Sequence, residues 1–142
     1  MSLSKGYNAD MKKSSLLLSI FALAFVFGLM HVISTRFYLF WTTWWADKLM
    51  HLAGGVVLAM FVIWLVYSFG EAVAQDKKKL FGIAFLCVML IMVVWKVLER
   101  KFGIADSTQG YSLDFFLDFL ASAIGACLGW LYAASDRFRL HD

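Results

Sequence analysis

The stretch of sequence that decides the fold is residues 46–69, ADKLMHLAGGVVLAMFVIWLVYSF. An α-helix rises about 1.5 Å per residue, so about 20 residues cross the hydrocarbon core of a bilayer. After Asp47, Lys48 and His51 the stretch contains no side chain that is charged near neutral pH, and it is long enough to span a membrane. It therefore predicts a transmembrane helix with polar side chains in its first turns.

Three further apolar runs of similar length cover residues 16–34, 80–100 and 113–134. Helices are expected, because backbone polar groups in lipid must be paired within their own segment, and these runs do not alternate as barrel strands do. The first run is longer than the apolar part of a signal peptide, which indicates an uncleaved anchor. We expect an all-α protein, a four-helix transmembrane bundle that forms a single membrane domain over residues 1–142.

The composition also indicates a membrane protein. Hydrophobic residues make up 62% of the chain and charged residues only 16%, whereas soluble proteins carry about 25% charged residues. The net charge of +3 is modest and the basic residues are scattered, which argues against nucleic acid as a partner. Cys87 and Cys127 both lie in apolar runs, where cysteines behave as small hydrophobes.

Basic residues between the apolar runs predict the orientation. If the N-terminus is inside, the cytoplasmic segments hold eight lysines and arginines and the outer segments hold four. The positive-inside rule then places both termini in the cytoplasm, the N-in/C-in arrangement. The cytoplasmic set is Lys5, Lys12, Lys13, Lys77, Lys78, Lys79, Arg137 and Arg139, and the outer set is Arg36, Lys48, Arg100 and Lys101.

Most ionisable residues within the apolar runs lie at what this topology makes the outer ends of the helices. Charged groups inside a membrane are costly, and each is by default a functional candidate. Asp47 and His51 are four residues apart and share a helix face, as do Asp114 and Asp118. The members of this expected cluster are Asp47, Lys48, His51, Lys96, Glu99, Asp114 and Asp118.

Three interpretations of the cluster remain open. It could bind a divalent metal, with candidate ligands Asp47, His51, Glu99, Asp114 and Asp118. It could act as an acid–base set on a bound substrate, with candidate catalytic residues His51, Glu99 and Asp118. It could be a structural ion-pair network, with candidate cations Lys48, Lys96 and Arg100. A site should surround a cavity, whereas a structural network should leave no carboxylate unpaired and no room.

The last apolar run also carries small residues at intervals of four. Ala121, Gly125 and Gly129 lie on the face that bears Asp114 and Asp118. Small residues at this spacing let the backbones of two membrane helices approach closely. We therefore expect this face to pack against another helix.

Three pieces of sequence resemble known families of membrane proteins. Residues 47–51, DKLMH, are followed by Gly54 and Gly55 and resemble the Asp-Lys/Arg-x-x-His signature of VanZ-like and YjdF-like proteins. Residues 108–118, TQGYSLDFFLD, resemble the Thr-Gln-Gly-x-x-x-Asp-x-x-x-Asp pattern of YjdF-like proteins. Residues 118–126, DFLASAIGA, resemble a VanZ-like stretch, and Glu99 stands where both families place a glutamate.

The resemblance covers roughly residues 46–130 and includes two departures. Ser122 replaces a VanZ-like asparagine, and Lys96 replaces a glutamate that is common in YjdF-like proteins, which puts a cation where a metal ligand could stand. VanZ-like proteins are associated with tolerance to glycopeptide antibiotics, and YjdF-like proteins have no established activity. The resemblance implies an integral protein of the bacterial plasma membrane, and it names no reaction.

We therefore expect a small polytopic cell-envelope protein of the VanZ-like type. Its cluster would bind a lipid headgroup or a lipid-linked envelope precursor at the extracytoplasmic face. The alternative is a membrane-embedded enzyme that uses the same cluster on a lipid or lipid-linked substrate. A transporter or channel subunit is the third hypothesis, and with four helices it would need an oligomer. The expected partners are membrane lipids, and no cofactor is assigned beyond the divalent metal already named.

Overall fold

The computed structural model describes residues 2–69, 76–102 and 110–135 of the chain. Side chains are described within these ranges except for residues 2–10 and 41. Some residues used in the sequence analysis lie outside the described residues. These are Thr108, Gln109, Arg137 and Arg139, together with the side chain of Lys5.

The described chain is made of helices, which are α1 (Ser2–Arg36), α2 (Leu39–Thr42), α3 (Trp44–Phe69), α5 (Lys77–Lys101) and α6 (Tyr111–Ala133). Four of them, all except the short α2, are long and apolar enough to cross a membrane, which confirms the predicted all-α fold class. Helix α1 begins well before its apolar run, because hydropathy marks only the part of a helix that suits lipid. The orientation in the membrane stays a prediction.

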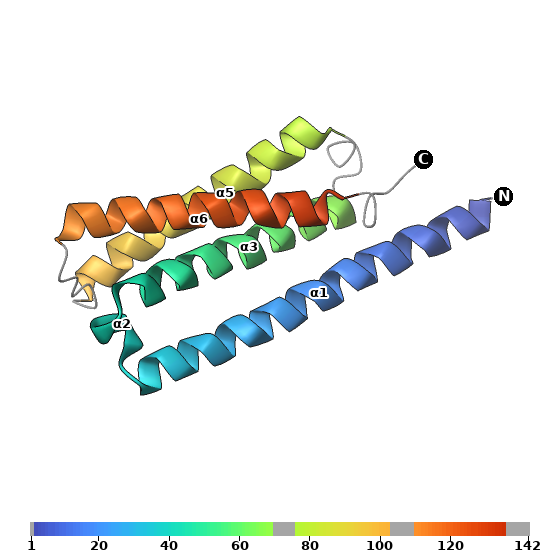
Figure 1. Ribbon diagram of the computed structural model, residues 1–142. Coiled ribbons are helices and arrows are strands. Elements are labelled where there is room, and N and C mark those ends of the chain that lie inside the picture. Colours follow the sequence, from blue (N-terminus) through green and yellow to red (C-terminus); the bar gives the residue numbers. More distant parts are fainter. Residues whose placement is uncertain (1, 70–75, 103–109, 136–142) are drawn as a thin grey trace.

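Helices that follow one another run in opposite directions. Figure 1 shows α3, α5 and α6 grouped together, with α1 alongside α3 at the edge of the group. The N-termini of α3 and α6 therefore meet the C-termini of α1 and α5 at one end of the bundle. We call this the polar end, and the end where α5 begins and α6 finishes the opposite end.

Helices α3 and α6 approach each other at backbone distance. A Cβ atom built on Gly55 would lie 2.5 Å from the carbonyl oxygen of Ser122, and one on Gly129 would lie 2.5 Å from that of Val56. A Cβ atom on Gly125 would meet the carbonyl oxygen of Leu52. Real Cβ atoms do not sit so close to backbone oxygens, so glycine is required at these positions for the helices to touch.

The apolar core fills the half of the bundle toward the opposite end. Leu16, Met60, Ile63 and Val88 are all at most 1% exposed and belong to one contiguous cluster of buried residues. Tyr67 is buried in the same half, where its hydroxyl donates a hydrogen bond to the carbonyl oxygen of Ala133 at 3.4 Å. The polar end of the interior is thereby left for charged side chains.

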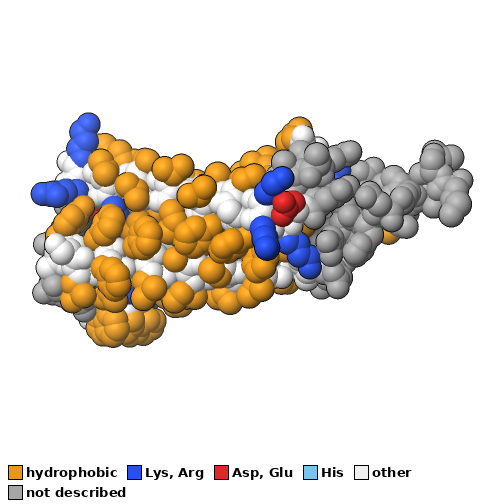
Figure 2. All heavy atoms as spheres, turned by 90° about the horizontal axis from the view of Figure 1, so that it is seen from above, with side chains coloured by type: hydrophobic (Ala, Val, Ile, Leu, Met, Phe, Trp, Pro, Cys, Tyr) orange, Lys and Arg blue, Asp and Glu red, His pale blue; other side chains and the backbone are white. Residues whose placement is uncertain are grey.

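The outside of the bundle is apolar along most of its length. Leu18, Phe25, Leu86 and Leu90 are each more than 60% exposed. Figure 2 shows hydrophobic side chains covering the middle of the molecule, with basic side chains gathered toward both ends. Such a surface is unfavourable in water and matches the hydrocarbon core of a bilayer with a charged zone on each side.

Helix α5 starts at a well-defined cap. The side chain of Asp76 accepts hydrogen bonds from the backbone N–H groups of Lys78 and Lys79 at 3.0 and 3.2 Å. These bonds, the one from Lys79 first, favour the ionised carboxylate and lower the pKa of Asp76 below its ordinary value of 3.8. The cap fixes where the helix enters its apolar segment.

Candidate functional site

The polar end contains a buried network of charged side chains contributed by α3, α5 and α6. Lys48 and His51 lie near the start of α3, Lys96 lies near the end of α5, and Asp114 and Asp118 lie near the start of α6. Asp118 is seven residues from the start of its helix, which corresponds to a depth of about 10 Å. At this depth a charge without a partner is costly, so the network must supply the pairing.

Lys96 holds three carboxylates together from within α5. Its ammonium nitrogen lies 2.6 Å from Glu99 Oε2, 3.0 Å from Asp114 Oδ2 and 2.5 Å from Asp118 Oδ2. Its side chain is only 1% exposed. A lysine is rarely so buried unless it is paired, and here the pairing ties α5 to α6.

Lys48 of α3 also pairs with three carboxylates. Its ammonium nitrogen lies 3.0 Å from Asp47 Oδ2 and 2.6 Å from Asp118 Oδ1, and it donates a hydrogen bond to Asp114 Oδ1. Asp114 and Asp118 are therefore shared between the two lysines. The result is a set of ion pairs that joins three helices at one end of the bundle.

Asp118 is the centre of the network. It is fully buried, and its two oxygens face different lysines. Among the described residues neither oxygen accepts a hydrogen bond, although the ammonium groups of both lysines lie within ion-pair distance. The attraction is therefore electrostatic, and Asp118 keeps unused capacity to accept hydrogen bonds.

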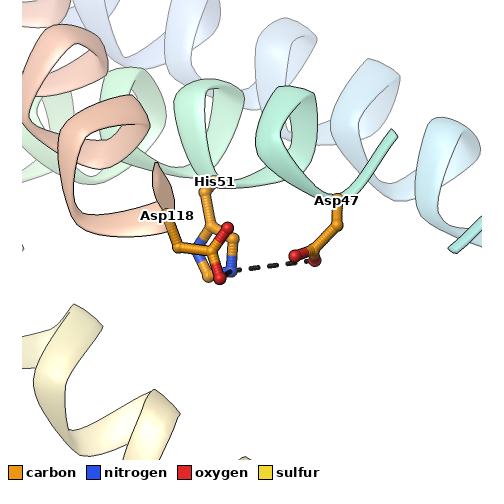
Figure 3. A group of neighbouring side chains, drawn as sticks. All are labelled: Asp47, His51 and Asp118. Atoms are coloured by element: carbon orange, nitrogen blue, oxygen red, sulfur yellow. Dashed lines mark ion pairs between the residues drawn. The ribbon is translucent and has the colours of Figure 1, made fainter. Parts of the chain in front are cut away.

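His51 stands between two carboxylates. Its Nε2 atom lies 3.4 Å from Asp118 Oδ2 and 3.7 Å from Asp47 Oδ1. Figure 3 shows Asp47 and His51 pointing from α3 to the same side, where Asp118 of α6 meets them. One ligand atom from each of these three residues lies within 4.8 Å of the others. The group has donors of the types that bind divalent cations.

Carboxylates outnumber cations in this network. Four carboxylates, those of Asp47, Glu99, Asp114 and Asp118, surround two lysines and one histidine. With a neutral imidazole the formal charge is two negative units, and protonation of His51 would remove one of them. The most exposed carboxylate is Asp47, whose side chain is 28% exposed, so the network opens toward the surface there.

One candidate cation from the sequence, Arg100, lies apart from the network. The guanidinium carbon of Arg100 is 4.8 Å from the centre of the Tyr111 ring, a cation–π contact, and no ion pair of Arg100 is found among the described residues. The imidazole of His31 contacts Phe40 with ring centres 5.6 Å apart. Ala121, Gly125 and Gly129 are buried on α6, with both glycines against α3.

The structure also shows features that the sequence did not indicate. Tyr111 gives Arg100 its partner, and a groove at the opposite end is lined by Lys77, Lys78, Phe81 and Trp130. From the sequence, Lys77 and Lys78 were expected only to lie on the cytoplasmic side of the membrane. Phe81 follows Lys77 at helical spacing, which was an available signal, but Trp130 lies far away in sequence and gave none.

Comparison with known proteins gives a family and nothing more specific. Neither the curated proteins nor the solved structures include a match. The family described as "Predicted membrane protein (DUF2238)" matches residues 9–137, which is most of the chain and includes all the residues of the network. This description agrees with the four helices that are long and apolar enough to span a membrane, and it names neither of the two families that the sequence motifs resemble. The chain therefore belongs to the membrane protein family DUF2238.

Proposed function

We propose that the polar network binds the ammonium group of a lipid headgroup at the membrane surface. The observation that carries the proposal is the excess of carboxylates over lysines in a buried network. In a medium of low dielectric constant such an excess favours the uptake of a cation. Under the predicted N-in/C-in topology this end faces outward, so the ligand would be an outer-leaflet lipid or a lipid-linked envelope precursor.

The arrangement favours a hydrogen-bonding cation over a bare metal ion. The ammonium groups of Lys48 and Lys96 each lie beside one oxygen of Asp118, and a divalent ion placed there would be repelled by both of them. A headgroup ammonium needs only the carboxylate at the rim, that of Asp47, which is partly exposed. It can donate up to three hydrogen bonds without displacing a lysine.

The test compares two lipids that differ only in their N–H donors. The full chain in detergent is titrated with phosphatidylethanolamine and with phosphatidylcholine of the same acyl chains, and bound lipid is counted by native mass spectrometry. We expect the ethanolamine lipid to bind more tightly. Asp47→Asn should weaken the binding of this lipid by about tenfold, which is the effect of losing a hydrogen bond to a charged group at a partly exposed position.

Asp76→Asn is the matched control, since it removes one carboxylate at the opposite end of the bundle. It should leave the lipid preference unchanged. Equal binding of the two lipids by the parent protein would refute the proposal. An equal loss of phosphatidylethanolamine binding in Asp47→Asn and Asp76→Asn would also refute it.

A membrane-embedded enzyme is the second candidate function. It is favoured by one observation, the proximity of Asp47, His51 and Asp118, whose ligand atoms could hold a metal ion that activates water. Titration with Zn²⁺ or Mn²⁺ followed by calorimetry tests it. Binding that is lost in His51→Gln would favour the enzyme, and an absence of binding by the parent chain would remove this candidate.

A further inference from the structure

The opposite end of the bundle carries a groove that the network at the polar end does not explain. The groove has a volume of about 300 Å³ and is lined by Lys77, Lys78, Phe81 and Trp130. It lies between the first turns of α5 and the last turn of α6. The surface of the groove is apolar, and the two lysines among its lining residues bring basic side chains to its edge.

The wall of the groove is aromatic. The rings of Phe81 and Trp130 meet edge to face with centres 5.1 Å apart, and the centre of the Phe85 ring lies 5.5 Å from that of Phe81. The buried indole N–H of Trp130 has no hydrogen-bond partner among the residues that the structure describes. An aromatic wall that remains open in a membrane protein suits an acyl chain.

The two lysines of the groove have no anionic partner among the described residues. The neighbouring carboxylate, that of Asp76, pairs with Lys79 at 3.6 Å and accepts backbone hydrogen bonds from Lys78 and Lys79. Lys77 and Lys78 are exposed at the rim. Within the described part of the chain, therefore, nothing pairs with these two ammonium groups, and they can face an anion.

The depth of the groove matches the boundary between headgroups and acyl chains. Phe81 comes four residues after the start of α5, which places it about 6 Å along the helix axis from that end. Trp130 comes three residues before the end of α6, which places it about 4.5 Å along the axis from that end. Lysines at the helix end would reach the phosphate level of the membrane, with the aromatic rings just beneath it.

We propose that this groove is a binding site for an anionic phospholipid. Its phosphate lies between the ammonium groups of Lys77 and Lys78, and one acyl chain runs along Phe81 and Trp130. A soluble anion would use the lysines and gain nothing from the aromatic wall, whereas a lipid uses both. The site is separate from the polar network, and the inference does not depend on the function proposed for that network.

The experiment uses the full chain in detergent and native mass spectrometry. Phosphatidylglycerol and phosphatidylcholine with identical acyl chains are titrated separately, and we expect the parent protein to prefer phosphatidylglycerol. Lys77→Gln with Lys78→Gln should weaken the binding of phosphatidylglycerol by about 25-fold, at about fivefold for each lysine near an anionic lipid. The same double variant should change binding of phosphatidylcholine little.

The control double variant is Lys79→Gln with Lys101→Gln, which removes the same charge from positions that do not line the groove. It should retain the preference for phosphatidylglycerol. Phe81→Ala should weaken the binding of both lipids. Trp130→Phe should retain binding, because an aromatic wall remains. Helix content measured by circular dichroism shows whether each variant is folded.

Three outcomes would overturn the inference. They are equal binding of the two lipids by the parent protein, an equal loss in the control double variant, and displacement of the lipid by an equal concentration of soluble glycerol phosphate. The last result would show that the aromatic wall contributes nothing. Asp47→Asn should leave phosphatidylglycerol binding unchanged, so failure here is distinguishable from failure at the polar network.

Discussion

Replacing Gly125 by alanine tests the packing that positions the polar network. The added methyl group would meet the carbonyl oxygen of Leu52, and it would lie 3.0 Å from the carbonyl carbon of the same residue and 3.1 Å from Gly55 Cα. All three are backbone atoms and cannot rotate away. The substitution must therefore move α3 and α6 apart, which also separates Lys48 from Asp118.

The expected size follows from the cost of overpacking. An extra methyl group in a tight core costs about 1–3 kcal/mol, and a glycine-to-alanine change within a helix returns up to about 1 kcal/mol. Gly82→Ala is the matched control, because a Cβ atom built there meets nothing within 4 Å. The two variants share the gain in helix propensity, so their difference should equal the full cost of overpacking.

The assay is unfolding in mixed micelles with increasing dodecyl sulfate, followed by far-ultraviolet circular dichroism. Gly125→Ala should unfold at lower dodecyl sulfate than the parent, with a free energy of unfolding about 1–3 kcal/mol below that of Gly82→Ala. Equal stability of the two alanine variants would refute the close contact between α3 and α6.

Other predictions concern the ion pairs, the helix cap and the topology. Lys96→Met should lower the free energy of unfolding by about 3–5 kcal/mol, because it leaves buried carboxylates without their cation. Lys101→Met, at an exposed position, should change the free energy of unfolding by less than about 0.5 kcal/mol. Equal effects of the two substitutions would show that Lys96 is not paired. Because the pKa of Asp76 is lowered on folding, its stabilisation is present above pH 3.8 and lost as the pH falls through the lower folded value. The free energy of unfolding should therefore fall less between about pH 5 and pH 2 in Asp76→Asn than in the parent protein. The same fall in both proteins would contradict the cap. Alkaline phosphatase fused after Asp142 should be inactive if both termini are cytoplasmic, and an active fusion would invert the topology.

The fold class could be predicted because lipid imposes one rule on every residue of a span. Apolar runs of spanning length, such as residues 46–69, leave few alternatives to a helix. The ends of the helices were less certain, because polar residues can continue a helix beyond the membrane, as α1 does from Ser2. Hydropathy indicates whether a segment lies in lipid or in water, and it indicates secondary structure only indirectly.

The membership of the polar network could be expected from helix ends alone. Antiparallel helices bring the start of α3, the end of α5 and the start of α6 together, so Asp47, Lys96 and Asp118 had to lie at similar depth. Which side chains meet depends on how each helix is rotated about its axis. The small residues of α6 indicated how that helix is rotated, but no such pattern indicated the rotation of α5, and Arg100 therefore could not be distinguished from Lys96.

What the network binds is tested most directly by magnetic resonance in a membrane. The parent protein carries ¹³C at its aspartate carboxylates and is reconstituted with phosphatidylethanolamine that carries ¹⁵N in its headgroup. A second sample with ¹⁵N only at lysine provides the reference, since Lys96 Nζ lies 2.5 Å from Asp118 Oδ2. We expect dipolar transfer from headgroup nitrogen to the carboxylate of Asp47, and its loss in Asp47→Asn. Strong transfer from lysine with none from the headgroup would show that the network pairs only with itself, and it would contradict the proposed function.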